Sequence, residues 1–373
     1  MRAVPPHSLR PFVLASALAW AGCVVAASAQ PIVAFGDSLS DTGNVLAFSQ
    51  SPLAQALGFT PRPDAPWYQP GQFTNGTIGT GGLSTATAYT QGNWLNVLAD
   101  RLGRERPMAA GLTPDIAPLG TNYAWGGAQA NEGSLLPPLD VQVGFYLNGP
   151  NAPTPSTPPT PGTPPTLYTF WLGGNDLVNA AEAPGATPAS IAAAGANAIT
   201  ALRTQIQRLT TAAGSTESLD VLWPNLPSLD RTPAGAALDP ALRDALALAS
   251  ADFRVAQLQA ASELRLSNPS LNLLTLDVYT LFNQILDDPA AYGLIDVATP
   301  VLDAPDFTQP GPFVPTLNVP SDANPDQYAF WDSLHPTAHM HALIGEAAAR
   351  LVPAPGVASL LALVGVVSIR RRR

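Results

Sequence analysis

The chain has 373 residues, of which 46% are hydrophobic, 40 are proline and 30 are glycine, so it can bury one large core or two smaller ones joined by irregular segments. It carries 27 acidic and 17 basic residues, a formal net charge of −10, which argues against binding to phosphate backbones and hence to nucleic acid. Its one cysteine, Cys23, lies in an N-terminal segment that we expect to be removed, which excludes a disulfide framework, a cysteine nucleophile and a thiolate metal site.

Residues 1–29 have the features of a secretory signal peptide. Two arginines precede an apolar run over 12–27, and the small residues Ala-Ser-Ala at 27–29 provide a cleavage site. We therefore expect an exported protein whose mature chain begins at Gln30. A membrane anchor is the alternative interpretation of this segment.

Four short apolar runs predict buried strands, and two long amphipathic segments between them predict helices. The predicted strands span 32–35, 167–172, 219–223 and 271–276. The predicted helices open at Thr187-Pro188 and Asp239-Pro240, where a capping side chain precedes a proline at the first helical position. Buried strands that alternate with helices predict a parallel α/β sheet covered on both faces.

Two segments interrupt this alternation. Residues 77–92 are rich in glycine and threonine, and residues 149–165 consist mostly of proline, threonine and serine. We expect both to be surface insertions within one domain that spans 30–352, the second of them extended and similar to polyproline. An inert spacer is the simplest interpretation of the second insertion. The sequence contains no internal repeat.

Residues 35–44, with the sequence FGDSLSDTGN, follow the first predicted strand. Gly36 permits a sharp turn, and Ser38 then lies at the carboxyl end of the strand, where open α/β sheets bind ligands. A helix that starts there would direct backbone N–H groups at a developing anion. Ser38 is therefore a candidate nucleophile, with a simple helix cap as the alternative.

Residues 330–337, with the sequence FWDSLHPT, place an acid three residues before a histidine and a proline directly after it. Pro336 favours an extended His335 and suits the first position of the next helix. An apolar stripe over 340–351 would anchor that helix. Asp332 can then bind Nδ1 of His335, which is the geometry that an imidazole base needs. A surface histidine without a catalytic role is the alternative.

The spacing of His335, His339 and His341 also suggests a metal site. No carboxylate or thiolate joins the three histidines at ligand spacing, so we expect no metal here. Nothing else in the sequence calls for an organic cofactor.

Two middle blocks bring hydrogen-bond donors to the ends of strands. Residues 120–128 (GTNYAWGGA) place the N–H of Gly127 in a loop, and residues 171–176 (WLGGND) place the side chain of Asn175 after a strand. Together with the N–H of Ser38, these groups could converge on one oxyanion, where a single donor is worth about 10²–10³ in rate. An ordinary turn is the alternative for the second block.

The C-terminal end resembles a PEP-CTERM sorting signal. A Val-Pro-Ala-Pro-Gly sequence at 352–356 precedes the apolar stretch 357–369 and four arginines at 370–373, although alanine replaces the usual glutamate at Ala354. The 13 apolar residues would span about 20 Å as a helix, which is short for a hydrocarbon core of ~30 Å. The resemblance implies recognition and cleavage by an exosortase near Pro355, a Gram-negative-type envelope, and transient membrane association through this helix.

The four blocks occur in the order typical of SGNH hydrolases, also called GDSL esterases and lipases, and the sequence from Pro31 to Val352 resembles that family. The continuation of the first block as Ser-Asp-Thr-Gly-Asn, the sequence Phe-Thr-Asn-Gly at 73–76 and the later Trp94 add to the match. Two features depart from the pattern. Gln72 stands where an arginine is common in the family, and the insertion 77–92 separates Asn75 from Trp94; both could alter the acyl pocket.

The resemblance implies a flavodoxin-like three-layer α/β/α sandwich with a five-stranded parallel sheet. It also implies Ser38 as nucleophile, Asp332 and His335 as its partners, and Gly127 and Asn175 in the oxyanion hole with the N–H of Ser38. A backbone carbonyl can assist the acid in this family, so the role of Asp332 is the least fixed.

The resulting hypothesis is an exported serine hydrolase that cleaves acyl esters, such as lipids, small esters or acetylated polysaccharides, through an acyl-enzyme on Ser38. Acyl transfer at the same site is one alternative. A catalytically silent envelope or matrix-binding protein is the other, although such a protein would not need a serine, an asparagine and a histidine together.

Overall fold

The computed structural model describes residues 31–76, 88–111, 120–131, 136–150, 152, 165–214 and 218–353. The expected signal peptide at 1–29 and most of the insertions 77–92 and 149–165 therefore lie outside the described residues, as does the sorting-like tail from residue 354 onward. Within the described ranges, no helix combines the length and the apolar character needed to cross a membrane.

The centre of the fold is a parallel sheet, as predicted. Its strands are β1 (Ile32–Gly36), β2 (Leu167–Trp171), β3 (Leu219–Pro224) and β4 (Leu271–Leu276), which lie side by side in that order. The four predicted apolar runs thus form the four strands, with ends that differ by one residue at most. All four strands are parallel, and β1, β2 and β3 are buried throughout, which explains why they are continuous apolar runs rather than alternating ones.

The resemblance implied five strands, whereas the described residues form a four-stranded sheet. A fifth segment, 121–125, lies along the free edge of β1. The N–H of Ala34 donates to the carbonyl of Thr121 (3.0 Å), and the N–H of Trp125 donates to the carbonyl of Gly36 (3.0 Å). Only isolated bridges result, because the segment turns away at Gly126-Gly127 directly after it has passed β1.

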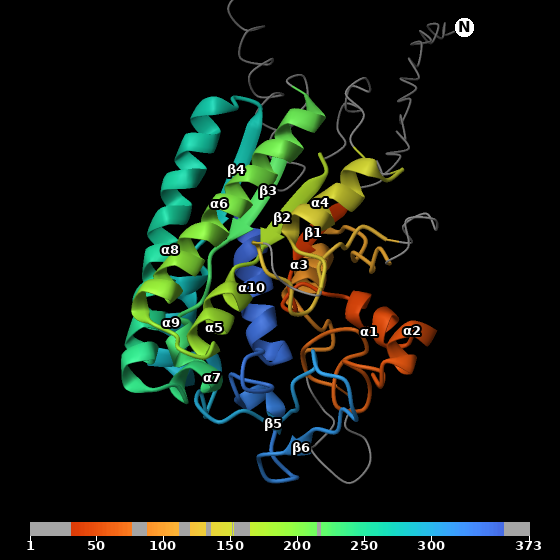
Figure 1. Ribbon diagram of the computed structural model, residues 1–373, viewed down its shortest axis with the longest axis vertical. Coiled ribbons are helices and arrows are strands. Elements are labelled where there is room, and N and C mark those ends of the chain that lie inside the picture. The colour runs from red at the N-terminus through yellow and green to blue at the C-terminus, as the bar shows by residue number, and fades with distance from the viewer. Residues whose placement is uncertain are drawn as a thin grey trace, which may run out of the picture.

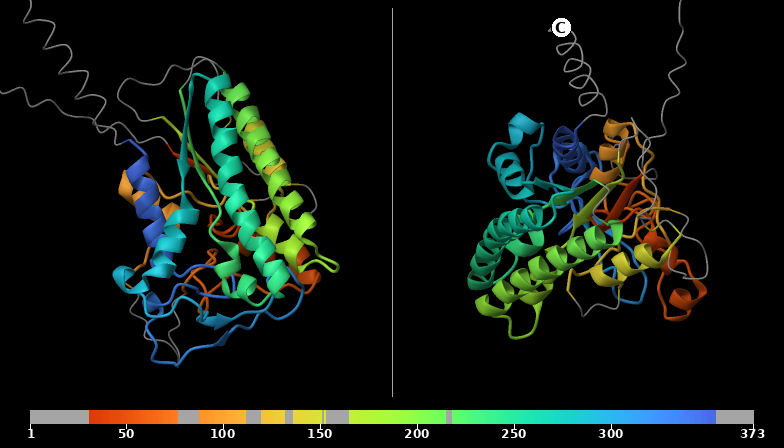
Figure 2. Two further views of the ribbon diagram at one scale, coloured as in Figure 1. Left: turned by 90° about the vertical axis from the view of Figure 1, so that its left-hand side faces the viewer. Right: turned by 90° about the horizontal axis from the view of Figure 1, so that it is seen from above.

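Helices cover both faces of the sheet, so the predicted three-layer arrangement is confirmed (Figure 2). Successive residues of a strand point to opposite faces, and the β1 side chains divide accordingly. Val33 and Phe35 pack in the larger core cluster, whereas Ile32 and Ala34 pack in the smaller one. The larger cluster lies under α4 (Leu139–Asn148), α5 (Gly174–Glu182), α6 (Pro188–Ala213) and α8 (Pro240–Ser267). The smaller one lies under α3 (Trp94–Leu102), the start of α9 (Val278–Asp287) and α10 (Ala338–Leu351).

The two predicted helix starts differ in how they are capped. Thr187 caps α6 through a reciprocal capping box with Ser190, as expected. The prediction of a side-chain cap at Asp239 is wrong, since its carboxylate accepts no hydrogen bond from α8. Asp239 is exposed, so water can satisfy the first N–H groups of α8, and the Asp239 carbonyl accepts the N–H groups of Leu242 and Arg243.

The helix after the histidine block begins later than predicted. Pro336 is not its first residue, because α10 starts at Ala338 and Thr337 is its N-cap. Thr337 accepts from the N–H of Met340 and donates to the carbonyl of Tyr328 (2.8 Å), which fixes the start of α10 to the preceding loop. Most of the predicted apolar stripe is covered, although the last member, Leu351, is 41% exposed.

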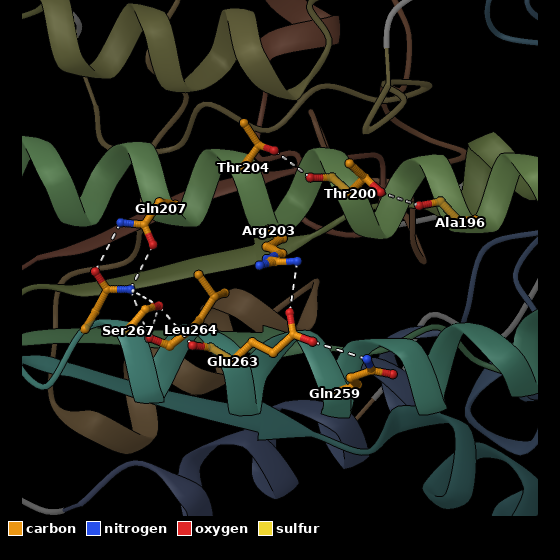
Figure 3. Close-up of polar contacts among 10 residues, drawn as sticks. Ala196, Thr200, Arg203, Thr204, Gln207, Gln259, Glu263, Leu264 and Ser267 are labelled. Carbon is orange, nitrogen blue, oxygen red and sulfur yellow. Dashed lines mark hydrogen bonds and ion pairs between the residues drawn. The ribbon is translucent and has the colours of Figure 1, made fainter.

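The outer surface of the larger layer is formed by α6 and α8, which run side by side (Figure 1). A polar groove of about 530 Å³ lies between them. Arg203 and Glu263 form an ion pair across it (2.9 Å), and Gln259 donates to the same glutamate (Figure 3). Both charged side chains are about half exposed, so this pair adds little to stability.

The remaining elements gather beyond the carboxyl ends of the strands, in the lower part of Figure 1. They are α1 (Asn44–Ser49), α2 (Pro52–Ala56), α7 (Pro233–Ala236), the antiparallel pair β5 (Leu302–Asp303) and β6 (Thr316–Leu317), and the 3₁₀ turns Leu229–Arg231, Pro289–Tyr292 and Pro325–Gln327. These short elements, and the loops between them, build the walls around the end of the sheet.

The close approach of α10 to α3 depends on Gly345. A Cβ at this position would lie 2.7 Å from the carbonyl oxygen of Trp94 and 2.6 Å from Cβ of Val97. We expect Gly345→Ala to lower the free energy of unfolding by about 1–3 kcal/mol, because α10 must move off α3. Denaturant unfolding measures this effect.

The matched control is Gly144→Ala in α4, where the nearest atom to an added Cβ is a guanidinium nitrogen at 3.7 Å. This variant should be as stable as the wild type or slightly more stable, because alanine favours a helix over glycine by about 1 kcal/mol. Equal destabilisation by the two substitutions would contradict the close-packing argument.

Candidate active site

Ser38, His335 and Asp332 form a continuous hydrogen-bonded row. Nε2 of His335 lies 2.7 Å from Oγ of Ser38, and Nδ1 lies 2.9 and 2.8 Å from the two carboxylate oxygens of Asp332. All three side chains are buried. Ser38 follows β1, whereas the other two lie in the loop before α10. With Asp332 as acceptor at Nδ1, the other ring nitrogen is free to accept the serine proton.

The loop that carries His335 is a closed turn. The carbonyl of His335 accepts the N–H of Trp331 (2.8 Å), and its own N–H donates to the carboxylate of Asp332 (2.8 Å). Residues 73–75 hold it from the other side. The ring of Phe73 packs on the imidazole at 4.8 Å, the hydroxyl of Thr74 donates to the carbonyl of Pro336, and the Asn75 side chain accepts from the start of α10. The imidazole orientation is therefore fixed by the surrounding chain.

A buried tyrosine completes the surroundings of Asp332. The hydroxyl of Tyr68 donates to Oδ2 of Asp332 (2.7 Å), and the N–H of Leu334 donates to Oδ1 (2.9 Å). Burial raises the pKa of Asp332, but the attraction of His335 and the hydrogen bonds from His335 and from the N–H of Leu334 lower it by more, so the net pKa lies below its usual value. Burial and the neighbouring carboxylate raise the pKa of Tyr68 well above its usual value, so it remains a donor.

Polar side chains of the first block fix the turn that carries Ser38. The carboxylate of Asp41 accepts the N–H groups of Gly43, Asn44, Val45 and Gly126, and the Asn44 amide donates to the carbonyls of Asn122 and Ala124. The block at 35–44 is thus attached to the block at 120–128 through buried hydrogen bonds. The two blocks form one structural unit, which explains why both are polar although both are buried.

The Asn175 side chain is hydrogen-bonded to the residue that follows Gly127. The Asn175 side chain donates one hydrogen bond to the carbonyl of Ala128 (2.9 Å), which leaves its second N–H for another acceptor. The backbone N–H groups of Ser38 and Gly127 have no acceptor among the described residues. Ser38, Asn175 and His335 border one cavity; Gly127 does not border it, but is held beside it through the bond to Ala128.

A glutamine from α4 fixes the end of β1. The side chain of Gln142 is fully buried, accepts the N–H of Gly36 (3.0 Å) and donates to the carbonyl of the same residue (2.9 Å). Asp37, which follows Gly36 in the chain, borders the cavity, and burial raises its pKa to about 7. Its carboxyl group is therefore neutral in a large fraction of molecules near neutral pH.

The three C-terminal histidines have separate surroundings. His339 stacks on Tyr89 at 4.3 Å and bonds the carbonyl of Asp326. His341 accepts from the N–H of Trp94 (3.3 Å), and burial lowers its pKa to about 3, so it is neutral. Across the described ranges, no group of histidine, cysteine and acidic side chains is arranged to hold a metal ion.

Sequence reasoning missed the residues that support the site from a distance. Tyr68 and Asp332 are 264 positions apart, and Gly36 and Gln142 are 106 positions apart, so no local pattern connects them. Gln72, which departs from the family pattern, accepts from the N–H of Asn93 and the amide of Asn96, at the start of α3.

This combination of an open parallel α/β sheet with a buried serine, histidine and acid at its carboxyl edge is the arrangement found in serine hydrolases. A family model described as GDSL-like Lipase/Acylhydrolase matches residues 32–348, and the chain belongs to this family. It is accordingly a carboxylic ester hydrolase of the esterase and lipase class.

Known proteins similar to this chain include esterases and lipases. A GDSL esterase/lipase of Arabidopsis thaliana is 27% identical over 345 residues, which cover 84% of this chain and 83% of the plant protein. Two solved structures are similar at a lower level. The extracellular lipase of Streptomyces rimosus has a TM-score of 0.32 and 16% identity, over 68% of this chain and 82% of the lipase. The inhibitor-bound aryl esterase of M. smegmatis has a TM-score of 0.38 and 15% identity, over 87% of this chain and all of the esterase (100%).

The contact between Tyr68 and Asp332 predicts a pH effect. In Tyr68→Phe, the carboxylate of Asp332 loses the hydrogen bond from the Tyr68 hydroxyl, so its negative charge is less well stabilised. We expect the acidic limb of the kcat/KM profile to move to higher pH, because a carboxylate that loses a hydrogen-bond donor has a higher pKa and Asp332 is then protonated at higher pH. We also expect kcat to fall by about tenfold, as loss of one such hydrogen bond allows. KM should change little, since Tyr68 does not border the cavity.

Tyr168→Phe is the matched control. Tyr168 is also buried, and its hydroxyl lies 2.9 Å from that of Tyr146 and does not bond Asp332 or His335. It should lose stability without any shift of the pH profile. A profile that is unchanged in Tyr68→Phe, or shifted equally in both variants, would argue for a merely structural role of Tyr68.

Proposed function

We propose that this protein is an exported esterase that hydrolyses acyl esters through a covalent acyl-enzyme on Ser38. The observation that carries the proposal is the 2.7 Å contact between Oγ of Ser38 and Nε2 of His335, with Asp332 at the other ring nitrogen. A serine hydroxyl is a weak nucleophile on its own, and an adjacent imidazole that can take its proton activates it. Asp332 holds the ring in position and stabilises the imidazolium that forms.

In the first half of the reaction, Nε2 of His335 takes the proton of Ser38 while Oγ of Ser38 attacks the carbonyl carbon of the ester. The tetrahedral intermediate then collapses, the bond to the alcohol oxygen breaks, and His335 gives its proton to the leaving alcohol. In the second half, His335 takes a proton from water, the hydroxide adds to the acyl carbon, and Ser38 recovers its proton as the acid leaves. No metal or cofactor enters these steps.

The negative charge of the intermediate rests on three donors in this proposal. They are the backbone N–H of Ser38, the backbone N–H of Gly127 and the second N–H of the Asn175 amide. The bond from Asn175 to the carbonyl of Ala128 supports this assignment, because it orients the amide next to the Gly127 loop before substrate arrives. Preorganised donors of this kind need no rearrangement when the charge develops.

Two alternatives use the same fold differently. A catalytically silent binding protein has no need for an aligned serine, histidine and carboxylate, and the intact row of hydrogen bonds supports catalysis over this alternative. Acyl transfer to another alcohol would follow the same first half-reaction. Product analysis separates the two reactions, since hydrolysis releases the free acid and transfer gives a new ester.

Export is the part of the proposal that rests on the sequence alone. Residues 1–29 resemble a signal peptide, 30–352 form the catalytic domain, and 353–373 resemble a PEP-CTERM tail that an exosortase would process. We propose a location at the cell surface or outside the cell, in a Gram-negative-type envelope, with a transient membrane contact of the tail before cleavage.

The nucleophile assignment predicts that Ser38→Ala loses at least about 10⁴-fold in kcat on p-nitrophenyl esters, because a triad without its nucleophile retains only the contribution of the oxyanion site. Asn175→Ala should lose about 10²–10³-fold. Initial rates of p-nitrophenol release measure both effects.

Ser40→Ala serves as the matched control, two positions along the same turn. Ser40 is buried and accepts from Nε1 of Trp94 (3.1 Å), so its loss should reduce stability while kcat stays within about tenfold of the wild type, since a lost neutral hydrogen bond is worth about 1 kcal/mol. Turnover by Ser38→Ala at the wild-type rate would end the nucleophile assignment.

The export assignment predicts the two ends of the mature protein. Mass spectrometry of the protein recovered from outside the cytoplasm should give an N-terminus at Gln30 and a C-terminus near Pro355. An intact Met1 would contradict signal cleavage, and an intact Arg373 would contradict processing by an exosortase.

A further inference from the structure

An apolar cavity of about 40 Å³ lies directly beside Ser38. Ser38, Asn175 and His335 border one end of it. The rest of its wall comes from the segment after β3 and from α9, α10 and the loop between β6 and α10, and most of its side chains are buried. The main ones are Leu226, Leu229, Val278, Phe282, Phe330 and Ile344. The cavity therefore lies between the candidate nucleophile and buried apolar side chains of the core.

The polar groups in the wall are already used elsewhere. The hydroxyl of Thr232 donates to the carbonyl of Leu229 (2.7 Å) and accepts the N–H of Gly235 (3.1 Å). The indole N–H of Trp171 donates to the carbonyl of Asn225 (3.0 Å). Away from Ser38, the wall therefore offers no hydrogen bond to a ligand, and it suits a hydrocarbon chain.

The border of the cavity disfavours negative charge. Asp37 lies at the end next to Ser38, where one oxygen accepts the N–H of Leu39 (3.0 Å). A substrate carboxylate in this apolar space would lose its hydration and gain no cation, since none of the residues that border the cavity is lysine or arginine. The occupant must then be uncharged as well as apolar.

The size of the cavity limits the length of the chain. A single water needs about 10–15 Å³ measured in this way, so a cavity of 40 Å³ holds about three or four groups of that size. This corresponds to an acyl group of two to four carbons, counted from the carbonyl. A longer chain would have to displace Phe282 or Ile344, which belong to close-packed clusters of the core.

The other side of His335 is more open. The rings of Phe73 and Phe307 flank the imidazole at 4.8 and 6.2 Å. Phe307 is only half-buried, and it lies in the exposed loop between β5 and β6, which Arg62 holds by donating to the carbonyls of Gln309 and Gly311. A large group that leaves along this side meets the partly exposed ring of Phe307.

We propose that the cavity beside Ser38 is the acyl-binding pocket and restricts the enzyme to esters of short, uncharged carboxylic acids, of about two to four carbons, while the alcohol lies against Phe73 and Phe307 and is little restricted in size. This assignment rests on the proposed role of Ser38. The substrate class that follows is acetyl, propionyl and butyryl esters, including those of bulky alcohols.

The test is the dependence of kcat/KM on acyl length for the wild-type protein. With p-nitrophenyl acetate, butyrate, octanoate and palmitate, the value should be highest at two to four carbons and at least about 100-fold lower at eight, since each methylene that a pocket rejects is worth about 10–200-fold. p-Nitrophenyl acetate and 4-methylumbelliferyl acetate, which differ in alcohol size, should agree within about tenfold, because the alcohol lies outside the pocket.

Phe282→Leu and Val278→Ala enlarge the pocket by different small amounts, so that one of them remains informative if the other does not fold. Each should raise the octanoate-to-acetate ratio of kcat/KM by about tenfold or more. Phe170→Leu is the matched control, because Phe170 is fully buried and does not border the cavity. It should cost stability and leave that ratio unchanged.

The outcomes separate the two proposals. No hydrolysis of any of these esters by the wild type would overturn the proposed function itself. Hydrolysis that is fastest with octanoate or palmitate would overturn the pocket assignment while the function stands. The same holds if neither enlarged variant changes the ratio, or if Phe170→Leu changes it equally.

Discussion

The hydrogen bond between Ser38 and His335 is the constraint on which the rest of the structure depends. The two residues are 297 positions apart, so the bond exists only if β1 and the loop before α10 end at the same edge of the sheet. The buried carboxylate of Asp332 must also be paired, because an unpaired charge in the core would lower the stability of the fold. Every other feature of the site supplies a donor to that charge or fixes one of the loops that carry the pair.

The polar residues of the sequence blocks contribute to structure at least as much as to chemistry. Asp41 gathers four backbone N–H groups, and Asn44 accepts from one loop while it donates to another. Residues 73–75 hold the histidine loop by ring packing and two hydrogen bonds. A site built in this way is rigid, since buried polar groups joined by several hydrogen bonds allow few alternative arrangements.

The sequence was sufficient to predict the sheet and the central pair of the site. Strands that are buried on both faces give continuous apolar runs, and the turn residues that follow them mark the carboxyl edge, so β1 to β4 could be located to within one residue. Ser38, Asp332 and His335 lie in short blocks whose residues are close in sequence to a predicted strand end or helix start. The order of the blocks then connected them to one family.

The supporting residues could not be predicted, because they act across long separations and carry no local pattern. Tyr68 lies in an irregular, proline-rich stretch, and its partner is fixed only by the packing of its ring on Phe73 and Trp331. Gln142 occupies an ordinary helical position. The failed cap at Asp239 has a similar origin, since exposure to water removes the need for a side-chain acceptor there. The fifth strand was expected from resemblance, and a short segment that meets β1 only through isolated bridges cannot be distinguished from a strand by its residues.

The direction of α10 has a consequence for how the molecule faces its surroundings. This helix starts beside the site and runs for 14 residues, about 21 Å, back along the sheet. It ends at Val352, which packs in the same cluster as Ile32 and Leu167, the first residues of β1 and β2. Both ends of the described chain therefore lie toward the amino-terminal ends of β1 and β2, the pole opposite Ser38. If the molecule were tethered to a membrane by either end, the pole that carries Ser38 would face away from that membrane. It would then meet esters that arrive from the medium and not esters in the membrane itself.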